Sequence, residues 1–369
     1  MAELVRLDGG AGEGGGQIVR TALALSALTG KPFIIENIRK GRPVPGLKAQ
    51  HMHAIKIMEK MCGGTSEGAA VGSETLKFFP GKLSSGNFGI DVGTAGSLTL
   101  ILQSAILPSL FCPSKVSFRL SGGTDVAWSM PVDYFAKVFL PHIAKYAEVS
   151  FKLEKRGYYP AGGGRIALKI VQKYSGERWK EAPRFRLDSQ GGIMAVRGIS
   201  HASSDLEASK AAEIQADTAR KNLPMLKCPL DISSEYCGAE SSGSGITLWA
   251  SFSKDGVSLD SMNPVILGVD ALCGKKISPE SAGKRAAQEL LLEMNSGAAV
   301  DEHLADNLIP FLAVFGGVMK VSRISDHTRT NVLVTEAFLG EVFDFNEGSR
   351  MISVKNPAID KLIDQVSGK

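Results

Sequence analysis

The 369-residue sequence lacks several features that would assign it to a common class of protein. It has no apolar run of the roughly 20 residues that a membrane-spanning helix needs, so we expect no membrane partner. Its five cysteines are odd in number and form no C-x-x-C pair, which favours reduced thiols over disulfides or a zinc site. Its first residues show no apolar segment typical of a secretory signal. We therefore expect a cytoplasmic protein, or a nucleoplasmic one if the source is eukaryotic.

Two widespread motifs for nucleotides and metals are also missing. The chain contains no G-x-x-x-x-G-K-[ST] and no H-E-x-x-H, so the P-loop and zinc-protease templates do not apply. Its formal net charge of +4 is too small to indicate a nucleic-acid partner unless the positive charges are clustered. With 44% hydrophobic and 22% charged residues, the composition is typical of a globular protein with a large core. Local groups of residues must therefore reveal the chemistry.

Six glycines surround a single carboxylate, Glu13, in the stretch LDGGAGEGGGQIVR (7–20). The residues before the glycines predict a short strand, and those after them predict a helix with apolar residues at helical spacing. A turn between a strand and a helix directs free backbone N–H groups toward an anion. Three of the glycines also satisfy the dinucleotide pattern G-x-G-x-x-G, with Glu36 near the expected distance. A basic, proline-containing loop follows and disfavours that interpretation, because a dinucleotide fold would continue with alternating strands and helices.

The most basic segment, 31–48, carries five cations against Glu36 alone: Lys31, Arg39, Lys40, Arg42 and Lys48. Such a run is often a solvated surface loop. Arginine, however, grips phosphate oxygens with two parallel hydrogen bonds, and two prolines stiffen this loop. Gln50 and His51 follow in the first turn of a predicted helix, where anions are favoured. The pattern therefore favours phosphate binding.

The opening pattern of strand, small-residue turn and helix recurs at 86–110 and, in part, at 158–171. We therefore expect an α/β (α+β) fold of repeated units of roughly 80 residues, with helices packed on sheets. A block at 185–275 shows the pattern of a strand, a helix and further strands, and it predicts a smaller inserted βαββ domain. The main catalytic domain would then comprise 1–184 and 276–369.

His327 is one of only six histidines, and it lies in RISDHTRTN between a predicted strand (320–324) and a predicted helix (330–339). The positive end of the helix would favour the neutral imidazole, which is its nucleophilic form, and would attract a phosphate. The alternative is a loop histidine that caps its neighbour. Glu13 is either an exposed loop acid or a ligand for a hard cation. Asp306, in HLADN, is either a surface helix acid or part of the site.

Seven motifs occur in order along the chain: EGGGQIVR, IRKGRPVPGLKAQH, GTAGS, SGGTDV, RGYYPAGGG, LADNLI and DHTRTN. Together, from about residue 5 to about residue 340, they resemble the RNA 3′-terminal phosphate cyclases. The resemblance implies three repeated α/β units, as in the enolpyruvyl transferases, and an inserted smaller domain similar to the C-terminal domain of a bacterial translation initiation factor. It also implies that the partner is an RNA with a 3′-phosphate end.

The resemblance implies a reaction in three steps. A histidine attacks the α-phosphorus of ATP and releases pyrophosphate, AMP passes to the RNA 3′-phosphate, and the vicinal 2′-OH displaces AMP and closes a 2′,3′-cyclic phosphate. The resemblance implies that His327 is the nucleophile. It also implies that Glu13 is the acidic residue that binds a divalent metal, Mg or Mn. The other positions implied to surround ATP and the RNA phosphate, the last two near the adenine, are Gln17, Arg20, Arg39, Arg42, Gln50, His51, Gln103, Asp306, Pro131 and Phe135.

Two positions depart from the family's usual pattern. His303 and Asn307 stand where the family often has Tyr and Gln, and both belong to the implied nucleotide region, so nucleotide choice is open. The family also includes a non-catalytic, RNA-binding branch of ribosome-assembly factors that keeps the fold but lacks the catalytic histidine. The presence of His327 disfavours that branch. An enolpyruvyl transferase of the same architecture would form no enzyme–AMP adduct and would need no adenine pocket.

Overall fold

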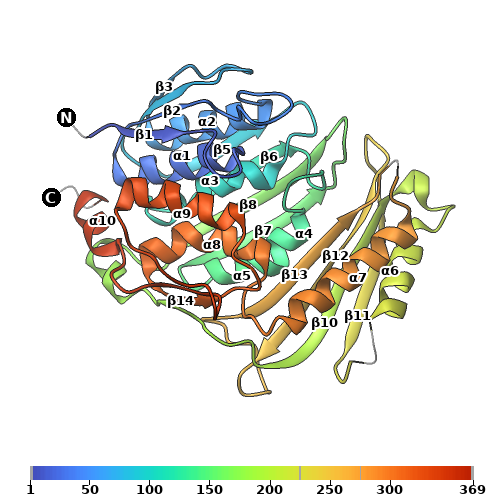
Figure 1. The fold of residues 1–369 in the computed structure, drawn as a ribbon. Helices are drawn as coiled ribbons and strands as arrows, with labels where there is room; N and C mark the ends of the chain where they lie inside the picture. The colour runs from blue at the N-terminus through green and yellow to red at the C-terminus, as the bar shows by residue number, and fades with distance from the viewer. Residues whose placement is uncertain (1–2, 224–225, 275, 367–369) are drawn as a thin grey trace.

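Three of the sheets in the computed structural model, which describes residues 3–223, 226–274 and 276–366, share one four-stranded topology (Figure 1). In each, the first two strands along the chain are parallel, and the fourth lies antiparallel between the second and the third. The first sheet contains β1 (Val5–Asp8), β2 (Phe33–Glu36), β3 (Thr65–Glu67) and β4 (Leu76–Phe79). The second contains β5 (Gly86–Asp91), β6 (Val116–Gly122), β7 (Ala147–Lys155) and β8 (Gly164–Gln172). The third contains β9 (Phe185–Leu187), β14 (Gly317–Lys320), β15 (Asp344–Asn346) and β16 (Met351–Val354).

Each unit places two helical segments between its strands, so the order βαβαββ occurs three times. The first unit has α1 (Gln17–Thr29) and α2 (Ala49–Cys62), and the third has α8 (Glu302–Phe315) and α9 (Asp326–Leu339). The second has α3 (Leu98–Leu110) and a segment made of α4 (Val132–Tyr134), the π-helical turn η1 (Phe135–Phe139) and α5 (Leu140–Ile143). Near the C-terminus, α10 (Ile359–Val366) packs on the 3₁₀ helix η2 (Gly176–Glu181). The repeated α/β units expected from the sequence are therefore confirmed.

Helix α1 lies at the centre of the three units, where it contacts α2, α3 and α9. All of its residues are buried except Arg20, in keeping with a sequence that is apolar or small on every side. The helix ends at Gly30, whose φ of 65° is left-handed and suits glycine. Its first turn, which begins at Gln17, is therefore held in a fixed position where helices from different repeats meet.

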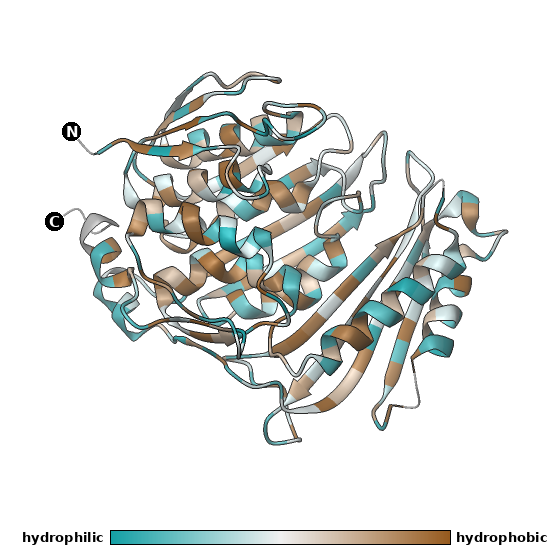
Figure 2. Cartoon of the chain, in the orientation of Figure 1, coloured by the Kyte–Doolittle hydropathy of each residue, from teal (hydrophilic) through white to brown (hydrophobic). Residues whose placement is uncertain are grey.

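A fourth sheet has a different topology and forms the insert. Its strands β10 (Gly192–Ser203), β11 (Leu230–Cys237), β12 (Ser244–Ser253) and β13 (Val265–Leu272) are ordered β11-β10-β12-β13. After β10 come the 3₁₀ turn η3 (Ser204–Leu206) and α6 (Ala211–Asn222). Helix α6 and α7 (Pro279–Asn295) lie side by side against this sheet. The apolar side of α7 is buried, and Figure 2 shows hydrophilic residues on its outer side.

The insert differs at both ends from the expected block at 185–275. Strand β9 pairs with β14 in the third sheet, so it belongs to the third repeated unit and not to the insert. Helix α7 packs on β12, β13 and α6, so it packs with the insert. The side-chain amide of Gln190 donates a hydrogen bond to the carbonyl of Met294 at 3.0 Å, so the two ends of the insert lie close together. The separation of the chain into two domains stays a prediction.

Two further expectations were reduced cysteine thiols and the absence of a membrane-spanning helix. All five cysteines are unpaired. Across the described ranges, none of the helices combines the length and the apolar character that crossing a bilayer requires.

Replacing residues 191–294 with a short Gly-Ser linker should leave a soluble protein, whereas deleting 185–275 should cause aggregation. The first deletion keeps β9 in the third sheet and removes α7 together with the sheet that it covers. The second removes β9 and leaves the apolar side of α7 without its partner. Soluble yield and size-exclusion chromatography distinguish these outcomes. Aggregation of both proteins would mean that the insert shares the main core, through the packing of Gly268 on Tyr134 and Val138.

Candidate active site

Four of the expected residues are in direct contact where α1 and α9 begin: Glu13, Gln17, Arg42 and His327. Glu13 comes from the glycine-rich turn and Gln17 is the first residue of α1. Arg42 comes from the loop between β2 and α2, and His327 is the second residue of α9. The structure thus brings the basic loop and the glycine-rich turn to the histidine that the sequence singled out.

Helix α9 begins earlier than the predicted helix at 330–339. It starts at Asp326, so His327 lies inside its first turn and not ahead of it. The side chain of Ser325 caps the helix by accepting a hydrogen bond from the backbone N–H of Thr328. The His327 side chain is 43% exposed, so a substrate can still reach it.

Gln17 fixes the position of the proton on the His327 ring. The amide nitrogen of Gln17 donates to the backbone carbonyl of His327 at 2.9 Å, and because a carbonyl only accepts, the amide oxygen faces the ring. That oxygen lies 2.6 Å from Nδ1 and also only accepts, so Nδ1 carries the proton. In the neutral ring, Nε2 then carries the lone pair and is the nitrogen available for nucleophilic attack.

Glu13 lies between His327 and Arg42. Its Oε2 is 2.5 Å from Nε2 of His327, and its Oε1 accepts a hydrogen bond from Arg42 Nη2 at 2.7 Å. Burial lowers the pKa of His327 below its usual value. Glu13 opposes this shift, whereas nearby positive charge, chiefly on His303 and Arg20, adds to it. A pKa below the usual value near 6.5 leaves the imidazole mostly neutral at pH 7.

Positive charge exceeds negative charge around the glycine-rich turn, because Glu13 pairs with Arg42 while Arg20, Arg39 and Lys48 lie nearby. Burial, together with the charge of Arg39, lowers the pKa of Arg20 to about 10. The pKa of Arg39 is lowered by burial and then by Arg42, and that of Lys48 by burial and then by Arg39. The Nε atoms of Arg39 and Arg42 and the Nε2 of His51 are buried and have no hydrogen-bond partner. A bound anion would accept from such donors and relieve the repulsion.

His51 is buried beneath Gly16. Its Nδ1 accepts from the backbone N–H of Lys48 at 2.9 Å, so the proton of the neutral ring is on Nε2. Burial, followed by the charge of Arg20 and other cations, lowers the pKa of His51 to about 3, so the ring is neutral. A Cβ at Gly16 would lie 2.0 Å from His51 Nε2, so only glycine fits at this position. The glycine therefore lets a donor ring pack directly beneath the turn.

A chain of hydrogen bonds joins α1, α3 and α8 next to this cluster. Arg20 Nε donates to Gln103 Oε1 at 2.7 Å, and Gln103 Nε2 donates to Asn307 Oδ1 at 2.6 Å. Asn307 Nδ2 donates to the carbonyl of His303 at 2.7 Å, while the side chain of His303 is exposed. Arg20, Gln103 and Asn307 are thus held together, and the expected influence of His303 and Asn307 on nucleotide choice stays a prediction.

Asp306 is hydrogen-bonded to the start of α9. Its Oδ1 accepts from Ser325 Oγ at 3.0 Å and from Thr328 Oγ1 at 2.8 Å, and its carbonyl accepts from Asn331 Nδ2 at 2.7 Å. Burial raises the pKa of Asp306 to about 7, against the opposing effect of the hydroxyl hydrogen bonds. The sequence alone did not identify Ser325, Thr328 and Asn331, whose hydrogen bonds to Asp306 position the helix turn that carries His327. The cap pattern S-x-x-T in SDHT was the signal that could have revealed the first two.

Three expected residues lie at other places. Gln50 is in the first turn of α2, where it packs against the turn before α3. Pro131 is the buried residue that precedes α4. Phe135 is fully buried and packs on Phe139 and Phe151, as part of the aromatic core. Their expected roles in binding the RNA phosphate and the adenine stay predictions.

Comparison with known proteins agrees with the seven motifs. A sequence profile of the family described as RNA 3′-terminal phosphate cyclase matches residues 11–345. The chain is 43% identical over 347 residues to the RNA 3′-terminal phosphate cyclase of Pyrococcus furiosus, a match that covers 94% of this chain and 96% of that protein. It is 40% identical over 352 residues to the protein of the same name from Archaeoglobus fulgidus, covering 95% and 99% of the two chains. The resemblance is thereby confirmed, and the chain belongs to the RNA 3′-terminal phosphate cyclase family of enzymes.

Proposed function

We propose that this protein converts the 3′-phosphate of an RNA to a 2′,3′-cyclic phosphate with consumption of ATP, through a covalent bond between His327 and AMP. Membership of the cyclase family implies an RNA substrate and the use of ATP. One observation carries the mechanistic proposal. The neutral ring of His327, with its Nε2 lone pair set by Gln17, lies beside a group of cations that outnumber the single carboxylate of Glu13.

In the first step, Nε2 attacks the α-phosphorus of ATP. A nitrogen–phosphorus bond forms as the bond from that phosphorus to the bridging oxygen breaks, and pyrophosphate leaves. The proton on Nδ1 stays in place, because it is hydrogen-bonded to Gln17 Oε1, which stabilises the positive charge that the ring gains. A lysine nucleophile would first have to lose a proton, whereas the imidazole of His327 is already neutral.

The cations around the glycine-rich turn fit the phosphates of ATP and the leaving pyrophosphate. Arg20, Arg39, Arg42 and Lys48 would share the negative charge, and His51 Nε2–H offers a neutral donor. Enzymatic phosphoryl transfer depends mainly on positioning and on neutralising charge, and this set of side chains supplies both. The mutual repulsion of the cations in the free protein would then be relieved by the substrate.

Glu13 fits a role in holding a divalent cation, Mg or Mn. Its Oε2 is buried without a hydrogen-bond partner and faces the Nε2 lone pair at 2.5 Å. A carboxylate oxygen this close to a lone pair is unfavourable unless a proton or a metal cation compensates its charge. A divalent cation would neutralise charge on the phosphate oxygens. Arg42, which donates to the other carboxylate oxygen, would orient Glu13 for this role.

The second and third steps use the same phosphorus and then the RNA end itself. In the second step, an oxygen of the RNA 3′-phosphate attacks the phosphorus of the adenylate and the bond to Nε2 breaks. In-line displacement requires the RNA phosphate to enter the position that pyrophosphate left. The cations that bound pyrophosphate would therefore bind the RNA end. In the third step, the 2′-OH attacks the RNA phosphorus, its proton is lost, and AMP leaves.

A non-catalytic role in ribosome assembly is the alternative for a protein of this family. An RNA-binding scaffold needs basic side chains, but it needs neither a histidine with a fixed tautomer nor a carboxylate beside it. The contacts among Gln17, Glu13 and His327 therefore support the catalytic proposal.

His327→Ala and His327→Asn should both remain folded and lose the covalent AMP label together with the cyclic product, because the nucleophile is gone. The measurement is incubation with a divalent metal and ATP labelled at the α-phosphate, followed by denaturing electrophoresis and acid treatment. His53→Ala, which changes a half-buried histidine of α2 outside the site, is the matched control and should label like the wild type. Labelling of His327→Ala at a near wild-type rate would contradict the assignment, and His51 would be the next candidate.

Arg42→Ala should reduce cyclisation of RNA 3′-phosphate ends about ten-fold or more, because a charge-assisted hydrogen bond contributes roughly 1.5–3 kcal/mol. Arg42→Lys should recover part of the activity, since it keeps the charge but loses the second hydrogen bond. Because Arg42 also contacts Glu13, the rates of enzyme–AMP formation and of RNA cyclisation are measured separately. The control is Lys40→Ala, an exposed cation of the same loop. Activity of Arg42→Ala within about two-fold of the wild type would show that Arg42 makes no important contact with the RNA phosphate.

A further inference from the structure

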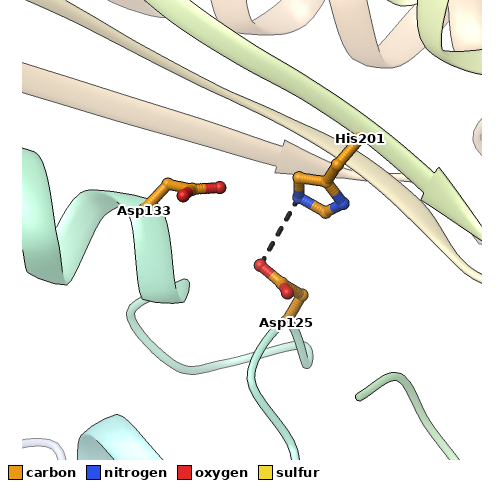
Figure 3. A group of neighbouring side chains, drawn as sticks. All are labelled: Asp125, Asp133 and His201. Atoms are coloured by element: carbon orange, nitrogen blue, oxygen red, sulfur yellow. Dashed lines mark ion pairs between the residues drawn. The ribbon is translucent and has the colours of Figure 1, made fainter. Parts of the chain in front are cut away.

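Five polar side chains meet between the second repeat and the insert, apart from the site described above. Asp125 follows β6, Asp133 lies in α4, Arg156 follows β7, His201 lies in β10 and Glu235 lies in β11. Asp125, Asp133, Arg156 and His201 are buried. Figure 3 shows the side chains of Asp125, Asp133 and His201 pointing toward one another across the boundary. No step of the proposed reaction uses these residues.

The negative charge of this cluster is only partly compensated. Arg156 donates to Asp125 Oδ2 at 3.1 Å, to Asp133 Oδ2 at 2.7 Å and to Glu235 Oε1 at 2.6 Å. Glu235 is half exposed and partly solvated, but the two aspartates are buried and face a single guanidinium. Isolated buried charge is costly, so a further cation would be favourable here.

Two buried atoms in the cluster have no hydrogen-bond partner, and both are ligand atoms for metals. They are Asp125 Oδ1 and His201 Nε2, on side chains that are 0% and 1% exposed. The two atoms are 3.4 Å apart without forming a hydrogen bond. Two ligand atoms about 2.0–2.1 Å from a tetrahedral zinc ion lie about 3.4 Å apart. One ligand atom from each of Asp125, Asp133 and His201 lies within 4.8 Å of the others.

One further polar atom on each of the three side chains is already held by neighbours. Asp125 Oδ2 accepts from Thr124 Oγ1 at 2.7 Å and from Arg156, and Asp133 Oδ2 also accepts from Arg156. His201 Nδ1 lies 2.9 Å from the hydroxyl of Tyr158. With a metal on Nε2, Nδ1–H would donate to that hydroxyl. Such outer contacts orient the ligands of metal sites, and here they leave one free ligand atom on Asp125 and one on His201.

We propose that Asp125, Asp133 and His201 bind one Zn²⁺ ion that fastens the insert to the second repeat. The ligand set of one imidazole and two carboxylates suits zinc, and a water molecule would complete the tetrahedron. Two ligands come from the main unit and one from the insert, so the ion cross-links parts of the chain that are distant in sequence. Because the ion binds the folded arrangement, it should stabilise that arrangement, and the stabilisation should increase with the logarithm of the free zinc concentration.

The test uses the full-length protein, stripped of metal with a chelator and desalted. Zinc is titrated in competition with a chromophoric chelator, the melting temperature is followed, and crystals of the zinc-loaded wild type are measured above the zinc absorption edge. We expect one tightly bound zinc per chain, a rise in melting temperature, and an anomalous peak between Asp125, Asp133 and His201. His201→Gln should lose both the zinc and the rise, whereas the control His53→Gln should keep both.

Two results would overturn the proposal. The first is the absence of an anomalous peak at these residues in the zinc-loaded wild type, which decides the matter even if the variants fold poorly. The second is zinc binding of equal affinity, with an equal rise in melting temperature, in folded His201→Gln. A peak only beside Glu13 and His327 would assign the bound zinc to the candidate active site and would also overturn it.

Discussion

Two hydrogen bonds between Gln17 and His327 join the first repeat to the third, and the candidate site depends on them. Gln17 begins a helix that is buried on nearly all sides, so its backbone is held in place by the core. His327 is placed by the cap of α9, and Asp306 holds that cap in turn. The fold therefore sets the tautomer of the histidine before any substrate binds, and it directs Nε2 toward Glu13 and the cations.

Side chains from other elements pack closely against the backbone of the glycine-rich turn, and this explains why the turn is rich in glycine. Gly12 has a left-handed φ of 58°, and a Cβ there would lie 2.2 Å from Thr330 Oγ1 of α9. A Cβ at Gly16 would collide with His51, as described above. The turn thus brings a carboxylate, a buried imidazole and several guanidiniums into a small space. The cations outnumber the single carboxylate and repel one another, which supports the proposal that the site binds a phosphate-bearing ligand.

Local patterns in the sequence predicted the elements, and long-range packing decided what could not be predicted. The alternation of strands, turns and helices revealed the repeated units, because strands, turns and helices each have sequence signals within a few neighbouring residues. Strand β9 has three residues and pairs with β14 far along the chain, so no local signal assigns it to the third sheet. The hydrogen bonds that position His327 join Asp306 of α8 to the start of α9, and the spacing of residues in the sequence does not show this contact. Phe135 packs on Phe139 within the core, a contact that spacing does not predict, and its expected place near an adenine stays a prediction.

The tautomer of His327 in the free protein tests most directly whether Gln17 prepares this histidine for its proposed role as nucleophile. In protein labelled with ¹⁵N at histidine and supplied with Mg²⁺ to compensate the Glu13 carboxylate, the ring signals of His327 are assigned by their loss in His327→Ala and are measured at pH 7. A protonated Nδ1 with an unprotonated Nε2 is the expected result, and Gln17→Leu should turn this into a mixture of tautomers. A proton on Nε2, or a doubly protonated ring at pH 7, would contradict the claim.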